Sequence, residues 1–212
     1  IPLMMLMQSY FTAGAIGMSK NAAETGTTTL KEMWQSANQN VFNLFLTNIL
    51  ITLITLAGIV FIVPGVLAVE DFDLLLNNPT DAAGSMILIT VGFIIWMLYM
   101  IAVNIVLSVS EYALVADNLD PITAVETGFS FFLNNKFDVF FLWLILIALS
   151  ICISIIGEFV SSIEAFAMIW TFLDLAISIL VIPPLTAIWW TRLFLDRTGR
   201  EMYDPNELLM YP

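Results

Sequence analysis

Long apolar stretches alternate with short polar segments along the chain. A transmembrane helix needs about 20 predominantly apolar residues to cross a hydrocarbon core that is roughly 30 Å thick. The stretches that reach or approach this length are 1–18, 43–68, 86–110, 137–157 and 166–191. The pattern therefore predicts an all-α integral membrane helical bundle with about five transmembrane helices. We expect residues 1–212 to form a single membrane domain.

Two further segments, 27–41 and 121–134, carry apolar residues at helical spacing instead of in continuous runs. The apolar faces consist of Leu30, Met33 and Trp34 in the first segment and Ile122, Val125 and Phe129 in the second. An amphipathic helix of this kind lies in the plane of the membrane interface. We therefore expect two cytoplasmic amphipathic surface helices in addition to the spans.

Both amphipathic segments begin with Thr-x-x-Glu, at 29–32 and 123–126, which is the pattern of a capping box. Each is followed by Asn-x-aromatic and then by a long apolar stretch. The sequence thus suggests a parallel internal repeat of 27–68 and 121–160. The alternative is that any chain that returns to the membrane needs a surface helix at such a place, without a repeat.

The charged residues are distributed unevenly between the two sides of this five-span topology. Lysine and arginine in short loops are retained in the cytoplasm. The basic residues, which all fall on one side, are Lys20, Lys31, Lys136, Arg192, Arg197 and Arg200. Loops 69–85 and 158–165 carry acidic residues and no basic residue. We therefore predict a cytoplasmic C-terminus and acidic loops outside, in a multi-pass protein of the cell membrane.

Composition limits the chemistry that the chain can perform. It contains no histidine, which removes the commonest general base and metal ligand, and its single cysteine cannot form a thiolate cluster. The net charge of −12 argues against nucleic-acid binding, which requires basic patches. We predict no catalytic residue, no cofactor and no metal site, and we expect that the protein is not an enzyme.

Polar residues in or beside apolar spans are costly in lipid and are therefore functional candidates. Asp174 in the last span is either a hydrated position near the outer surface or a proton or cation site with Asn104 as its neutral partner. Glu111 is either a solvated end of the third span or part of a relay. These three residues are the predicted intramembrane polar site.

Pro183 and Pro184 interrupt the last span. Proline lacks a backbone N–H, so this pair frees carbonyls one turn earlier, near Ile179 and Leu180. Broken membrane helices can bind ions in this way. The alternative is a packing kink, because neighbouring helices can satisfy freed carbonyl groups.

Several stretches resemble an uncharacterised archaeal family of multi-span membrane proteins. They are Ala13 to Met18 with the helix from Thr29 to Asn40, Tyr112 to Asp117, and Pro184 to Leu193. That family is similar to the membrane domain attached to some glycerophosphodiester phosphodiesterases. The resemblance implies a domain of six spans, with one span ahead of Ile1, and an archaeal origin. The catalytic domain of those enzymes has no counterpart in these residues.

These observations favour a non-catalytic membrane protein that acts as a scaffold or accessory subunit of a membrane assembly. Its expected partners are the lipid bilayer and other membrane proteins or further copies of itself. The alternative is a small transporter or channel that uses Asp174, Asn104 and the Pro183-Pro184 helix break. A third hypothesis, a membrane-embedded lipid enzyme, would have to work with aspartate and glutamate alone.

Overall fold

The computed structural model describes residues 2–69 and 83–203, and every regular element within these ranges is a helix. The helices are α1 (Pro2–Thr25), α2 (Leu30–Ala57), η1 (Gly58–Phe61), α3 (Val63–Leu67), α5 (Ala83–Val106), α6 (Ser110–Asp117), α7 (Pro121–Asn134), α8 (Lys136–Ser161), α9 (Glu164–Leu180) and α10 (Ile182–Arg197). The all-α prediction is confirmed.

Four helical stretches in the described part of the chain are long and apolar enough to cross a membrane. They are Leu30–Phe61, Ala83–Asp117, Lys136–Ser161 and Phe166–Arg197. Helix α1, which covers residues 2–18 of the predicted span 1–18, is not among them, because Gln8, Ser9 and Thr12 interrupt its apolar residues. The predicted acidic loop 69–85 lies largely outside the described residues.

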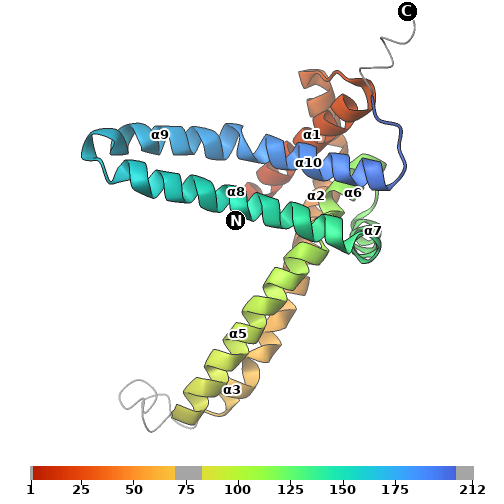
Figure 1. Cartoon of the computed structure of the whole chain (residues 1–212). Coiled ribbons are helices and arrows are strands. Elements are labelled where there is room, and N and C mark those ends of the chain that lie inside the picture. The colour runs from red at the N-terminus through yellow and green to blue at the C-terminus, as the bar shows by residue number, and fades with distance from the viewer. Residues whose placement is uncertain (1, 70–82, 204–212) are drawn as a thin grey trace, which may run out of the picture. The chain divides into compact units, whose positions relative to one another are not determined.

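The chain divides into two compact units, one formed by residues 1–47 and 108–212 and the other by 48–107. In the smaller unit, η1 and α3 pack along α5 (Figure 1). The Tyr99 hydroxyl donates a hydrogen bond of 2.8 Å to the Ile54 carbonyl. A Cβ on Gly65 would lie 2.5 Å from the backbone nitrogen of Ile89, so only glycine permits this approach of α3 to α5.

In the larger unit, α6 is the most enclosed helix and packs against α1, α7 and α10. Helix α10 contributes a buried stripe at helical spacing, made of Ala187, Trp190, Thr191, Phe194 and Leu195. The Phe194 ring packs on Phe131 of α7 with ring centroids 5.5 Å apart. Helices α8 and α9 run side by side as a hairpin, and α9 leads directly into α10 (Figure 1).

The prediction of a separate surface helix at residues 27–41 is wrong, because residues 30–41 belong to the longer helix α2. The helix that begins at Leu30 continues without interruption to Ala57. The segment between 40 and 43 contains neither proline nor glycine, so nothing in the backbone ends the helix there. The capping box at its start is confirmed, since the Thr29 N–H donates to Glu32 at 2.7 Å and the Glu32 N–H donates to the Thr29 hydroxyl at 3.4 Å.

Helix α7 is a separate helix, as predicted, but it begins with a different cap. Asp120 is its N-cap, and the carboxylate accepts hydrogen bonds of 3.2 Å from the backbone N–H groups of Ile122 and Thr123. Pro121 occupies the first helical position, where its missing N–H costs nothing. The predicted box at 123–126 is therefore wrong, because Thr123 already lies inside the first turn. The predicted repeat of 27–68 and 121–160 stays a prediction.

Candidate functional site

An apolar cavity of about 720 Å³ lies within the larger unit, bounded mainly by α1, α6 and α10. Phe11, Ala15 and Ile16 line it from α1, and the last turn of α9 contributes Ile179. Its volume falls in the range of small-molecule sites, roughly 300–1,000 Å³. We refer to this space as the apolar cavity.

Glu111 brings a carboxyl group into the wall of the apolar cavity. It lies in the first turn of α6. The side chain is half-buried, and no hydrogen bond or ion pair joins its carboxylate to another residue in the described ranges. The neighbouring Tyr112 also lines the cavity, and its ring stacks on Trp190 with centroids 6.1 Å apart.

Pro183 and Pro184 line the same cavity as Glu111. The helix breaks at Val181, whose N–H still donates to the Ile177 carbonyl at 3.0 Å. The two prolines form the first turn of α10 and supply no N–H to the carbonyls of Ile179 and Leu180. The predicted helix break is therefore present, and the structure brings it together with one of the three predicted polar residues.

The other two predicted polar residues do not line the apolar cavity. Asp174 is partly exposed on α9 of the larger unit. Asn104 belongs to the smaller unit, where it is exposed and donates a hydrogen bond of 2.9 Å to the Met100 carbonyl of its own helix. Their pairing around an ion or proton stays a prediction.

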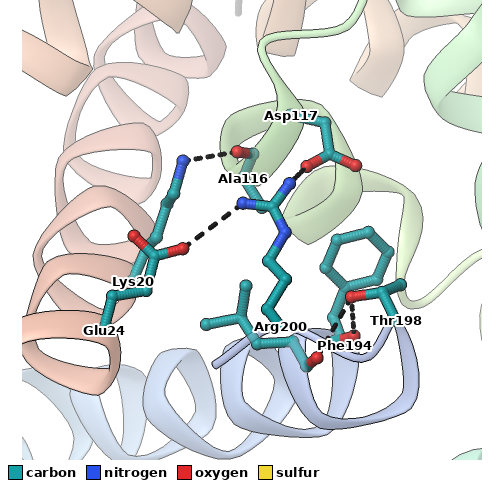
Figure 2. Close-up of polar contacts among 8 residues, drawn as sticks. Lys20, Glu24, Ala116, Asp117, Phe194, Thr198 and Arg200 are labelled. Carbon is teal, nitrogen blue, oxygen red and sulfur yellow. Dashed lines mark hydrogen bonds and ion pairs between the residues drawn. The ribbon is translucent and has the colours of Figure 1, made fainter. Parts of the chain in front are cut away.

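A group of charged side chains ties α1, α6 and the end of α10 together (Figure 2). The Arg200 guanidinium pairs with Glu24 of α1 at 3.3 Å and with Asp117 of α6. The Lys20 ammonium donates a hydrogen bond of 2.6 Å to the Ala116 carbonyl. We call Lys20, Glu24, Asp117 and Arg200 the polar brace.

The carbonyl that Lys20 contacts belongs to the last turn of α6, where a helix leaves carbonyls without internal partners and carries partial negative charge. Asn118 ends α6 in the left-handed conformation, with φ 51° and ψ 47°. Its side-chain oxygen accepts a hydrogen bond of 3.4 Å from Asn40. The end of α6 is thus contacted from both α1 and α2.

A second, smaller cavity of about 330 Å³ lies next to the polar brace and has mostly polar walls. Lys20, Glu32 and Asn118 are among the residues that line it. A further ion pair, between Arg197 of α10 and Asp138 of α8 at 3.0 Å, joins the ends of these two helices. This pair, like the polar brace, holds helix ends of the larger unit together.

The predicted apolar faces of the two amphipathic segments point mainly away from the protein. On α7, Ala124, Gly128 and Phe131 are buried, whereas Ile122 is 64% exposed and Phe129 49% exposed. The exposed large residues at the start of α2 are Leu30 and Trp34. Met33 and Val125 are only partly exposed, and Met33 lines the apolar cavity.

Sequence reasoning missed both the polar brace and the contribution of α1 to the apolar cavity. Each brace residue is ordinary in the sequence, because Lys20 and Arg200 read as basic residues flanking spans. Their partners lie far away along the chain, and Arg200 is 83 residues from Asp117. One local signal was available at Asn118, since asparagine followed by leucine at a helix end is compatible with a left-handed cap.

Comparison with known proteins adds no family assignment. No protein-family model matches the chain, and neither curated proteins nor solved structures gave a match. Within residues 2–69 and 83–203, no three histidine, cysteine, aspartate or glutamate side chains lie close enough to hold a metal ion. The chain is a multi-span helical membrane protein.

Proposed function

We propose that the protein is a non-catalytic scaffold or accessory subunit of a membrane assembly. The observation that carries this proposal is the outer face of α7, where Ile122, Phe129 and Leu133 are 64%, 49% and 56% exposed. The opposite face of α7 packs on α6. A short helix that exposes three large apolar side chains on the face that its own chain does not cover is suited to contact another protein.

The polar brace supports the same proposal. It fixes α6, and α6 in turn supports α7 through the close contact of Gly128 with Ser110. A surface that binds a partner loses less entropy on association when its backbone is already held in place. The apolar α7 face is therefore carried by a helix that the brace and this contact help to hold in place.

We further propose a topology of five spans, with α1 as the first and the C-terminus in the cytoplasm. The positions of the six basic residues support this orientation. Single cysteines at Thr198 and Ser162 in a Cys152→Ser background would test it with a membrane-impermeant maleimide. Labelling of Thr198→Cys only after the membrane is opened supports the orientation, and labelling of Thr198→Cys in intact cells overturns it.

An archaeal origin and the resemblance to the archaeal family remain part of this proposal.

The experiment that tests the scaffold function isolates the chain from its native membrane in lipid nanodiscs and measures the stoichiometry of everything that accompanies it. We expect a stoichiometric protein partner or a defined number of copies of the chain itself. The variant Ile122→Ser/Phe129→Ser should lose that partner. The matched control is Phe159→Ser/Ile163→Ser, which removes similarly exposed apolar residues at the end of α8 and in the turn before α9 and should retain it. A wild-type chain that is isolated alone would overturn the proposal.

A small transporter or channel is the second candidate function. One observation favours it, namely that Glu111 and the broken segment at Pro183 and Pro184 share a single cavity. Flux across liposomes that contain the purified protein would support this candidate if Glu111→Gln abolished the flux. Flux that depends on Asp174 instead would support a site formed by Asp174 with Asn104. Liposomes with no flux above the protein-free background would remove this candidate.

A further inference from the structure

The walls of the apolar cavity carry charge at one point. Among the described residues that line it, only Glu111 and the phenol of Tyr112 have an ionisable side chain. The remaining lining comes mainly from alkyl and aromatic side chains, including Phe11, Ile16 and Ile188. A ligand for this cavity must therefore be largely apolar and must meet one carboxyl group.

The two basic side chains that contact α6 are engaged at its other end. Lys20 donates to the Ala116 carbonyl, and Arg200 pairs with Glu24 and Asp117. Neither of them lines the apolar cavity. A carboxylate in apolar surroundings without a hydrogen-bond partner is costly, so the cavity leaves Glu111 available for a donor that a ligand supplies.

We propose that the apolar cavity binds an amphiphilic amine from the bilayer, with its hydrocarbon chain against α1 and α10 and its ammonium group on the Glu111 carboxylate. An ammonium group that donates to the Glu111 carboxyl and neutralises its charge would offset the cost of placing that charge among apolar side chains. This inference does not depend on the scaffold function, because the cavity and the outer face of α7 share no residue.

Other occupants fit the cavity less well. A phospholipid would bring a phosphate next to Glu111, and no lysine or arginine among the described lining residues could neutralise it. A transmembrane helix of a partner is about 10–12 Å across, so 720 Å³ would hold little more than roughly one of its turns. A single-chain amine matches both the volume and the charge.

The test measures binding of radiolabelled dodecylamine to the full chain in phosphatidylcholine nanodiscs, with empty nanodiscs as background. Dodecanol and dodecyl phosphate carry the same chain with a neutral and an anionic head. We expect saturable binding of dodecylamine that is stronger than binding of either control. Glu111→Gln should weaken dodecylamine binding by about tenfold and leave dodecanol binding unchanged, since a hydrogen bond to a charged group is the stronger kind.

Two matched controls separate ligand binding from general damage. Asp174→Asn removes a carboxyl group that does not line the cavity and should bind dodecylamine like the wild type. Ala15→Phe fills the cavity and should weaken binding of all three probes, whereas Ala176→Phe, on an exposed position of α9, should not. Glu111→Asp keeps the charge and should retain the preference for the amine even if Glu111→Gln lowers stability.

Several outcomes would overturn the proposal. Equal binding of dodecylamine and dodecanol to the wild type would mean that Glu111 does not select a cation. Binding that does not saturate above the empty nanodiscs would mean that ordinary lipid chains fill the cavity. A partner protein that cross-links through a photoreactive group at position 15 would assign the cavity to a protein segment instead.

Discussion

The Arg200 guanidinium, beyond the end of α10, pairs with the Asp117 carboxylate at the end of α6, which lies 83 residues earlier in the chain. The same guanidinium reaches Glu24 of α1 at 3.3 Å. One arginine therefore joins three helices that the sequence gives no reason to place together. The side chains are partly exposed, so the stabilising effect of these pairs is modest and depends on salt.

Arg200→Met should lower the stability of the folded chain. Removal of both ion pairs is expected to cost about 1 kcal/mol, as is typical of partly exposed pairs. The apparent Tm in detergent, measured by intrinsic fluorescence at low salt, would report the loss. Arg192→Met is the control, since Arg192 is exposed and forms no ion pair with a described residue. An equal Tm for the two variants would contradict the role of the brace.

Gly128→Ala should destabilise the chain, because a Cβ there would clash with the Ser110 hydroxyl and push α7 away from α6. Overpacking of this kind costs roughly 1–3 kcal/mol. Gly84→Ala makes the same change in α5, where a Cβ meets nothing within 4 Å. That control should be neutral or slightly stabilising, since alanine is the better helix former. Similar shifts in apparent Tm for the two variants would show that α6 and α7 are not closely packed.

Asn118 should tolerate glycine better than alanine. Both substitutions remove the amide that contacts Asn40, but only alanine must adopt the left-handed conformation with a Cβ. Alanine is therefore expected to be less stable than glycine by about 1 kcal/mol. Thermal unfolding of the two variants side by side measures this difference directly. A more stable alanine variant would mean that α6 does not end in a left-handed residue.

The Asp120 cap of α7 should make the stability of the folded chain depend on pH in the acid range. The hydroxyl of Thr123, at 2.6 Å, and then its backbone N–H hold the pKa of the Asp120 carboxyl below its ordinary value. Because the pKa is lowered on folding, the carboxylate contributes stability above the unfolded pKa, and this contribution is lost as the pH falls through the folded pKa.

Asp120→Asn provides the comparison, because asparagine keeps a capping oxygen but does not titrate in this range. The advantage in apparent Tm of the wild type over this variant should be larger at about pH 7 than at about pH 3. A difference in Tm that is the same at both pH values would show that the Asp120 carboxylate does not cap α7 in solution.

The sequence by itself was sufficient for the class of the protein and for most of the spans. Four of the predicted apolar stretches correspond to helices that could cross a membrane, because lipid requires long continuous apolar segments whose backbone hydrogen bonds are internal. The box at Thr29 and Glu32 was equally predictable, since its hydrogen bonds join residues three positions apart. Each of these features depends on short-range chemistry.

Tertiary structure decided which polar residues meet. The sequence singled out Glu111 and the prolines at 183 and 184 separately, but only the packing of α6 against α10 brings them to one cavity with α1. In the same way, the sequence pattern marked Lys20 and Arg200 only as basic residues beside spans, whereas folding joins both of them to the end of α6. The apolar pattern identifies a helix that enters lipid. It does not identify the neighbours of that helix, because lipid-facing and partner-facing residues are alike in hydropathy. The choice of neighbouring helices therefore depends on shape and on a few long-range polar contacts, which no local pattern records.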